Sequence, residues 1–181
     1  MNRFLKILES ARDNKWCMNL YCTTCGATEF RSAMKQLGDG LADELASLDL
    51  SVLTEMPNWD ETIRLVLDDI RKAELMDRVL TAWLPQLDRN IRMADLILFY
   101  YVRRGAINAP MSIEVLQRWR EKCVELAVQT GNESLVESLI YTLGDFRKYP
   151  ELDMAVQKLV ARGARRVEAA LRQQGFEIPS L

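Results

Sequence analysis

The chain has 181 residues, 49 % of them apolar, and its 24 basic and 26 acidic side chains leave a formal charge of −2 at pH 7. This apolar content is enough to build a core, which excludes a chain disordered throughout, and the near balance of charge argues against a general binder of polyanions. The sequence has no histidine, which excludes Ser-His-Asp and Cys-His catalysis and every zinc site that uses an imidazole.

Apolar residues recur with a helical period along nearly the whole chain. Phe30, Met34 and Leu37, for example, lie four and three residues apart, the spacing of one face of an amphipathic helix. Glycine and proline punctuate these segments, as is usual at helix ends. The predicted helices cover residues 3–13, 28–37, 41–56 with a break near Asp49, 59–70, 75–84, 91–102, 113–130, 133–143, 151–162 and 164–174.

Polar residues mark where several of these helices begin and end. We expect Asp88 to cap the helix over residues 91–102 and Ser112 to cap the long helix over residues 113–130, because short polar side chains accept hydrogen bonds from the first free amides of a helix. Gly131 and Gly163 follow two of the predicted helices. Glycine at that position favours a left-handed terminating residue.

The predicted fold class is all-α, with eight to ten short helices and no convincing strand. No run of residues alternates between apolar and polar in the way that a half-buried strand does. Two architectures fit: a compact helical bundle, or a short α-solenoid of helix pairs. We expect a single helical domain over residues 1–181, in which residues 15–27 form an N-terminal cysteine-bearing loop.

Three cysteines, Cys17, Cys22 and Cys25, fall within nine residues, and a glycine follows the last. C-x-x-C-G is the form of a zinc knuckle, in which a tight turn aims both thiolates at one metal. Structural zinc takes four ligands, so Cys17 is the predicted third and Cys123, in the stripe of a long helix, the predicted fourth. Asp13, a water molecule or a second chain could complete the site instead, and Cys123 could be a small buried apolar residue.

Two other interpretations of the cysteines stay open. The spacing C-x4-C-x2-C resembles the cluster loop of plant-type [2Fe–2S] ferredoxins over nine residues, and this resemblance implies an iron–sulfur cluster. The bulky residues at positions 18, 20 and 21 and the helical pattern of the remaining chain depart from that family. Cys22 and Cys25 also have the spacing of a thioredoxin-type redox pair, although no βαβ pattern surrounds them.

Charged residues are unevenly distributed. Residues 39–77 hold eleven acids against three bases, and residues 147–172 hold seven bases against three acids. Such runs are usually solvated helix faces, which here could also attract each other across the fold. The alternative is an acidic surface that docks a basic protein. The acids that we predict to contact this partner are Asp43, Glu44, Asp60, Glu61, Asp68 and Asp69.

These features favour a non-catalytic protein that binds another macromolecule: an adaptor, a regulator or an inhibitor of a basic protein, with a structural zinc loop. A redox or sensing protein that uses the cysteine cluster is the alternative, and nucleic-acid binding through the basic C-terminal helices is the second. The longest apolar run has seven residues, whereas a membrane span needs about 20. Without a secretory leader, we expect a cytoplasmic location, where thiols stay reduced.

Overall fold

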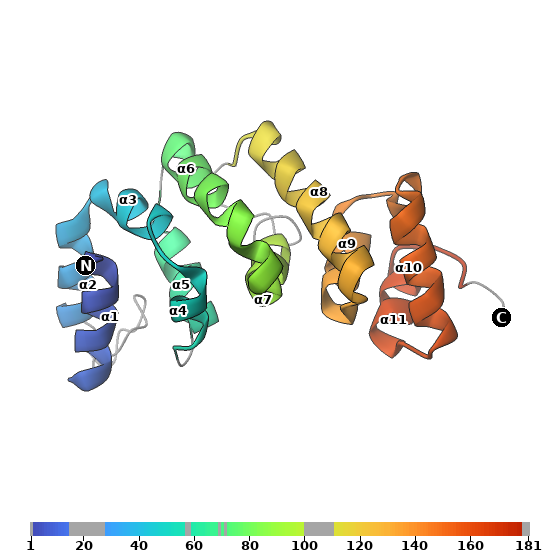
Figure 1. Ribbon diagram of the computed structural model, residues 1–181, viewed down its shortest axis with the longest axis horizontal. Helices are drawn as coiled ribbons and strands as arrows, with labels where there is room; N and C mark the ends of the chain where they lie inside the picture. Colours follow the sequence, from blue (N-terminus) through green and yellow to red (C-terminus); the bar gives the residue numbers. More distant parts are fainter. Residues whose placement is uncertain are drawn as a thin grey trace. The chain divides into compact units, whose positions relative to one another are not determined.

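A computed structural model describes residues 2–14, 28–56, 59–68, 70, 72–99 and 111–178 (Figure 1). No strand occurs in those residues, which confirms the all-α prediction. The α-helices are α1 (Arg3–Asp13), α2 (Thr28–Leu37), α3 (Gly40–Ala46), α4 (Leu50–Thr54), α5 (Trp59–Asp68), α6 (Ala73–Trp83), α7 (Ile91–Ile97), α8 (Ile113–Thr130), α9 (Glu133–Thr142), α10 (Pro150–Ala161) and α11 (Arg165–Gln173). Two 3-10 helices are η1 (Leu84–Arg89) and η3 (Phe146–Lys148).

The contacts between residues divide the chain into two compact units. Unit 1 comprises Met1–Gln86 and Ile107–Val115, and unit 2 comprises Leu87–Ala106 and Leu116–Leu181. Each unit has its own set of buried apolar side chains. A single domain over the whole chain stays a prediction, as does the choice between a bundle and an α-solenoid.

The predicted break near Asp49 is confirmed. Asp49 accepts a hydrogen bond from the amide of Ser51 at 2.9 Å and caps α4, so residues 41–56 contain two helices and the described part contains eleven α-helices, one more than the predicted eight to ten. Asp88 does not cap α7: it lies in η1 and forms an ion pair with Lys122, Oδ1 to Nζ, at 2.8 Å. The predicted cap of α8 is confirmed, because the amide of Val115 donates to Ser112 Oγ at 3.3 Å.

Left-handed glycines end two helices as the sequence predicts. Gly131 follows α8 with φ of 62°, and Gly163 follows α10 with φ of 76°. L-residues with a side chain rarely adopt this conformation, so glycine stops each helix at low energetic cost.

The interior of unit 1 is built from all its helices. α1 and α2 lie side by side (Figure 1), and α3 packs on α6. Trp83 of α6 is fully buried, and its indole Nε1 donates to the carbonyl of Leu45 at the end of α3 at 2.8 Å. The largest buried side chains of the unit are Phe4, Leu8, Phe30, Leu45, Leu48, Leu50, Leu53, Ile63, Leu67, Met76 and Trp83. Burying a side chain of this size stabilises the fold by roughly 1.5–3 kcal/mol.

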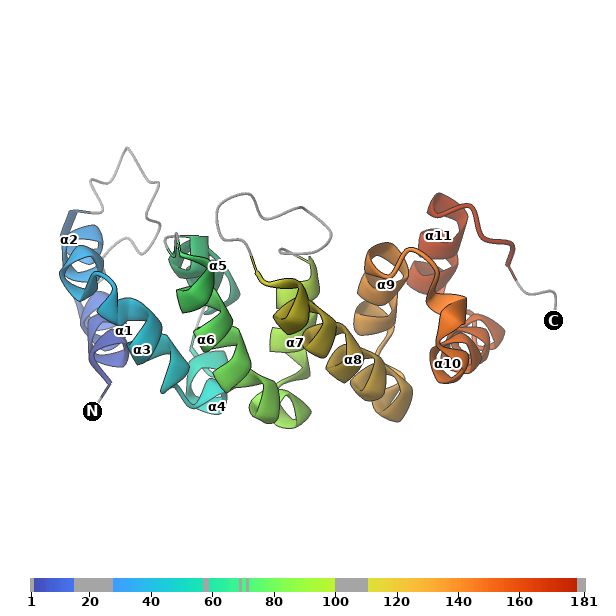
Figure 2. The same ribbon diagram turned by 90° about the horizontal axis from the view of Figure 1, so that it is seen from above.

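Unit 2 is organised around α9, which packs against α7, α10 and α11 (Figure 2). Asp95 of α7 accepts hydrogen bonds from two serine hydroxyls of α9, Ser134 Oγ at 2.5 Å and Ser138 Oγ at 2.6 Å. Trp119 and Cys123 of α8 are completely buried. Apolar contacts therefore hold these helices together, and the hydrogen bonds of Asp95 join α7 to α9.

Crossing a bilayer requires a helix that is both long and apolar. None of the helices within the described ranges combines these two properties.

Candidate functional site

The cysteine loop predicted to bind zinc, with Cys17, Cys22 and Cys25, lies outside the described residues. Within the ranges that the structure describes, no group of three or more cysteine, aspartate or glutamate side chains is placed to hold a metal ion. The zinc site and its iron–sulfur alternative stay predictions.

Cys123, the predicted fourth ligand, lies on α8 in unit 2 and is completely buried. Burial, with a smaller contribution from the nearby Asp95 carboxylate, raises the pKa of the Cys123 thiol far above its ordinary value. A thiol in this environment keeps its proton at neutral pH and packs as a small apolar residue. The surroundings therefore favour the packing role over the ligand role.

Two of the acids predicted to contact a partner form ion pairs with basic residues of unit 1. Asp43 forms an ion pair with Arg78 of α6. Glu44 accepts hydrogen bonds from the Nε of Arg3 at 2.8 Å and from its backbone amide at 2.6 Å. The hydrogen bond from the Arg3 side chain holds the pKa of Glu44 below its usual value. Glu44 is 17 % exposed and holds α3 to α1, whereas Asp43 and Arg78 are 66 % and 52 % exposed and form a surface pair between α3 and α6.

The remaining predicted acids belong to α5 and its end. Asp60 and Glu61 lie exposed in the first turn of α5, where their charge complements the helix dipole. Glu61 lies 3.9 Å from the guanidinium of Arg64 on the next turn. Asp68 is half-buried, and Asp69 lies outside the described residues. Among the described acids, Asp43, Glu44 and Glu61 thus lie beside a base, and a common acidic surface stays a prediction.

One base that pairs with these acids lies next to the acid-rich stretch in the sequence, although the count of charges over residues 39–77 leaves it out. The acid-rich stretch ends at residue 77, and Arg78, which forms an ion pair with Asp43, is the next residue. Arg78 lies on α6, which packs on α3, so only the tertiary contact brings it to Asp43. Arg3, the partner of Glu44, is 41 residues away in the chain.

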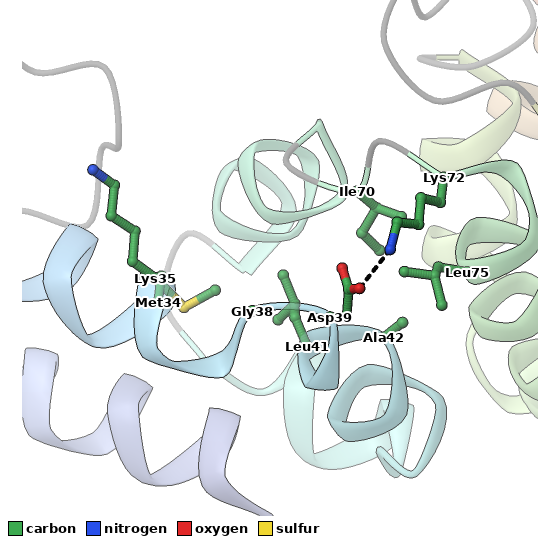
Figure 3. Close-up of a pocket in the computed structure, with 9 residues that line it drawn as sticks. All are labelled: Met34, Lys35, Gly38, Asp39, Leu41, Ala42, Ile70, Lys72 and Leu75. Carbon is green, nitrogen blue, oxygen red and sulfur yellow. Dashed lines mark hydrogen bonds and ion pairs between the residues drawn. The ribbon is translucent and has the colours of Figure 1, made fainter.

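A groove lies between α2, α3 and the start of α6 in unit 1. We call it the α3–α6 groove (Figure 3). It has a volume of about 350 Å³. Five apolar side chains line it: Met34, Leu41, Ala42, Ile70 and Leu75. Three charged side chains, Lys35, Asp39 and Lys72, stand at its rim.

An ion pair crosses the rim of this groove. The Nζ of Lys72 lies 2.5 Å from Asp39 Oδ2 (Figure 3), and this carboxylate raises the pKa of Lys72. The side chains of Asp39 and Lys72 remain 72 % and 52 % exposed. Asp39 precedes α3 but makes no side-chain capping bond, so its carboxylate is committed only to Lys72 among the described residues. An exposed pair of this kind contributes little to stability and exchanges readily with an external charge.

The two units differ in formal charge. Unit 1 contains 15 acidic and 10 basic residues, a net −5, whereas unit 2 contains 11 acidic and 14 basic residues, a net +3. Around unit 1 this imbalance attracts cationic groups and repels anionic ones. The uneven distribution of charge along the sequence therefore also appears as a difference in net charge between the two units, although individual acids are paired.

The basic stretch of unit 2 is also partly paired. Three of its bases form ion pairs at 2.9–3.4 Å: Arg147 with Asp145, Arg166 with Glu137 and Arg172 with Glu168. The other four form no ion pair within the described residues: Lys148, Lys158, Arg162 and Arg165. The predicted basic surface is therefore reduced to a few unpaired side chains.

Comparison of this chain with protein-family models, with curated proteins and with solved structures found no significant match.

Proposed function

We propose that this chain is a non-catalytic protein-binding scaffold whose α3–α6 groove receives a basic segment of a partner protein. An adaptor, a regulator and an inhibitor would all act in this way. The observation that supports the proposal is the exposed ion pair at the rim of an apolar groove, in a unit with a net charge of −5.

The groove offers two kinds of contact to such a segment. The apolar lining, which includes Leu41 and Leu75, accepts an apolar side chain and supplies affinity by removing it from water. Asp39 accepts a lysine or arginine beside that side chain in place of Lys72. The displaced ammonium group then turns to Glu74, whose charge already acts on Lys72. Replacing one exposed ion pair by another costs little free energy, and the Asp39 carboxylate selects a segment that carries a cation.

In this proposal, the cysteine loop has a structural role beside the groove. Residues 15–27 directly precede α2, which contributes Met34 and Lys35 to the groove. A zinc ion held by Cys17, Cys22 and Cys25 would cross-link this short segment and would so fix the start of α2. A cytoplasmic location, where thiols stay reduced, completes the proposal.

Site-specific photocrosslinking in the cells that produce the protein tests this function. A photoreactive residue replaces Lys35 at the rim of the groove or, as a control, Lys6, which is exposed on α1. We expect position 35 and not position 6 to capture a protein, and we expect the captured protein to carry a basic segment. The same proteins captured from both positions, or a nucleic acid captured from position 35, would contradict the proposal.

Binding of the captured protein to purified variants then tests the role of Asp39. We expect Asp39→Lys to weaken binding by at least about tenfold, since it replaces attraction by repulsion at the rim. Glu9→Lys makes the same change of charge on the exposed surface of α1, and we expect it to alter binding by less than about twofold at physiological salt. Equal effects of the two substitutions would show that only net charge matters.

A further inference from the structure

A second groove lies in unit 2, between the end of α8 and the length of α10. We call it the α8–α10 groove. It has a volume of about 290 Å³. Residues 128–131 form its α8 side, and Glu151, Met154, Ala155, Lys158, Leu159 and Arg162 form its α10 side. This groove shares no residue with the α3–α6 groove of unit 1.

The α10 side of this groove is one continuous stripe of the helix. Glu151, Met154, Lys158 and Arg162 are separated by three, four and four residues, so they lie above one another on the same face. The opposite face of α10 is buried in unit 2 through Leu152, Val156 and Val160, and Leu159 is buried at the edge of the groove. The buried face thus packs α10 against the rest of unit 2, while the stripe on the other face is directed outward.

The centre of the stripe is apolar and open to solvent. The side chain of Met154 is 53 % exposed, and Val128 across the groove is 37 % exposed. Only four large apolar residues are exposed among the described residues, and these two lie together in this groove. Methionine is flexible and polarisable, which suits it to contact with a partner's apolar side chains.

The end of the stripe is basic and has no internal partner. Lys158 and Arg162 are exposed and form no ion pair within the described part of the chain, whereas Arg147, Arg166 and Arg172 of the same unit are paired. Glu151 stands at the opposite end of the stripe. The stripe therefore runs from one acid through an apolar centre to two free cations.

We propose that the α8–α10 groove binds an amphipathic helix with acidic residues, supplied by a second protein partner. Apolar residues of that helix pack on Met154 and Val128, and its acidic residues lie beside Lys158 and Arg162. The stripe from Glu151 to Arg162 comprises twelve residues, or about 16 Å of helix, so three turns of a partner helix match its length. This proposal is independent of the function proposed for unit 1.

The apolar centre distinguishes a helical protein partner from nucleic acid. Single-stranded nucleic acid binds best where aromatic side chains interleave with cations and stack on bases. The α8–α10 groove has methionine and valine between its ends and no aromatic residue in its lining. Its shape and chemistry correspond to a helix-in-groove mode, in which residues at i, i+3, i+4 and i+7 anchor the ligand.

A displayed peptide library provides the probe. The library encodes three-turn helices with apolar residues at four positions of one face and glutamate or aspartate beside them, and it is selected on the full-length protein at physiological salt. We expect selected peptides to bind the full-length protein saturably. We further expect Met154→Asp and the double variant Lys158→Glu/Arg162→Glu each to weaken their binding by at least about tenfold.

A matched variant separates the groove from general charge. Lys148→Glu/Arg165→Glu makes the same total change of charge at exposed bases of unit 2 that do not line the groove, and we expect binding within about threefold of the parent. Circular dichroism and urea unfolding establish that all variants are folded.

Four results would overturn the proposal: no enrichment of peptides, selected peptides indifferent to Met154, equal loss in both double variants, or RNA competing at low concentration. Self-association of the protein that Met154→Asp abolishes would also overturn it, because the occupant would then be a second copy of the chain.

Discussion

At the scale of single residues, one glutamine joins two parts of unit 1 that the chain keeps far apart. Gln86 accepts a hydrogen bond from the amide of Leu50 through Oε1 and donates one from Nε2 to the carbonyl of Leu48, both at 2.9 Å. These backbone groups lie in the turn between α3 and α4, where no helical hydrogen bond can satisfy them. The side chain therefore completes the connection between two short helices.

We predict that Gln86→Ala destabilises unit 1 by about 1–3 kcal/mol, because it leaves two partly buried backbone groups without partners. Urea unfolding gives the free energy, and hydrogen exchange should show faster exchange of the Leu50 amide. Gln36→Ala is the control: Gln36 is exposed on α2, and its loss should change stability by less than about 0.5 kcal/mol. Equal effects of the two substitutions would count against a special role for Gln86.

The contact between Glu44 and Arg3 makes unit 1 sensitive to acid. The pKa of Glu44 in the folded chain lies below its usual value of 4.5, so the unfolded chain binds a proton more readily than the folded one. The stabilisation from this pair is fully present above that usual value and is lost as the pH falls through the lowered pKa.

We therefore predict that Glu44→Gln lowers the free energy of unfolding by a constant amount near neutral pH. The difference from the parent protein should shrink as the pH falls below about 4.5, where the parent loses its advantage. Urea unfolding at a series of pH values measures this, with Glu9→Gln as the control for an exposed carboxylate on α1. A difference that grows in acid would show that the sign of the linkage is wrong.

At the scale of helices, α7 and α9 are joined by a polar clamp inside an otherwise apolar contact. Asp95 receives both serine hydroxyls of α9, and Ser138 is only 3 % exposed. Burial to this degree keeps the Ser138 hydroxyl away from bulk solvent, so it depends on the carboxylate as its acceptor. Hydrogen bonds to a charged group of this kind contribute more than neutral ones.

Replacement of Asp95 by alanine should destabilise unit 2 by about 2–3 kcal/mol, since a buried hydroxyl loses its acceptor and a cavity forms. Asp95→Asn retains one oxygen in the same place and should cost less. Glu121→Ala, on the exposed face of α8, serves as the control, and hydrogen exchange of α7 and α9 locates the effect. The idea fails if Asp95→Ala unfolds at the same urea concentration as the parent.

At the scale of the whole molecule, the cysteine loop belongs to unit 1 in sequence and Cys123 belongs to unit 2. We predict that anaerobically purified protein contains about one zinc per chain and that Cys25→Ser loses it. Removal of the metal by a chelator should then increase hydrogen exchange in α2 and leave α9 unchanged. Iron with visible absorbance would instead support the iron–sulfur alternative, and a metal-free protein would contradict the zinc site.

Cys123→Ala tests separately whether Cys123 is the fourth ligand of the predicted zinc site. Because burial keeps its thiol protonated, we expect this variant to retain the zinc and to lose about 1–2 kcal/mol of stability from the small cavity in unit 2. Loss of the metal in both Cys25→Ser and Cys123→Ala would establish Cys123 as a ligand. Metal analysis and urea unfolding of the same samples distinguish these outcomes.

The helices and most of their ends are predictable from the sequence, because they depend on interactions between residues a few positions apart. The stripe of Phe30, Met34 and Leu37 is buried as its period predicts, and Ser112 and Gly131 stand where α8 begins and ends. The failure at Asp88 is of another kind: its partner, Lys122, is 34 residues away in the chain.

Which charges and which apolar residues are available to a partner depends instead on tertiary contacts. In the sequence, Asp43 and Glu44 cannot be distinguished from any exposed acid. In the folded unit, where α3 packs on α6 and α1, they form ion pairs with Arg78 and Arg3. Met154 is apolar but lies on the face of α10 opposite the buried Leu152 and Val156, and it is left open beside Lys158 and Arg162. Helix formation is governed by neighbours in the chain, whereas pairing and exposure are governed by residues far apart along it, so the sequence predicts the first and the fold determines the second.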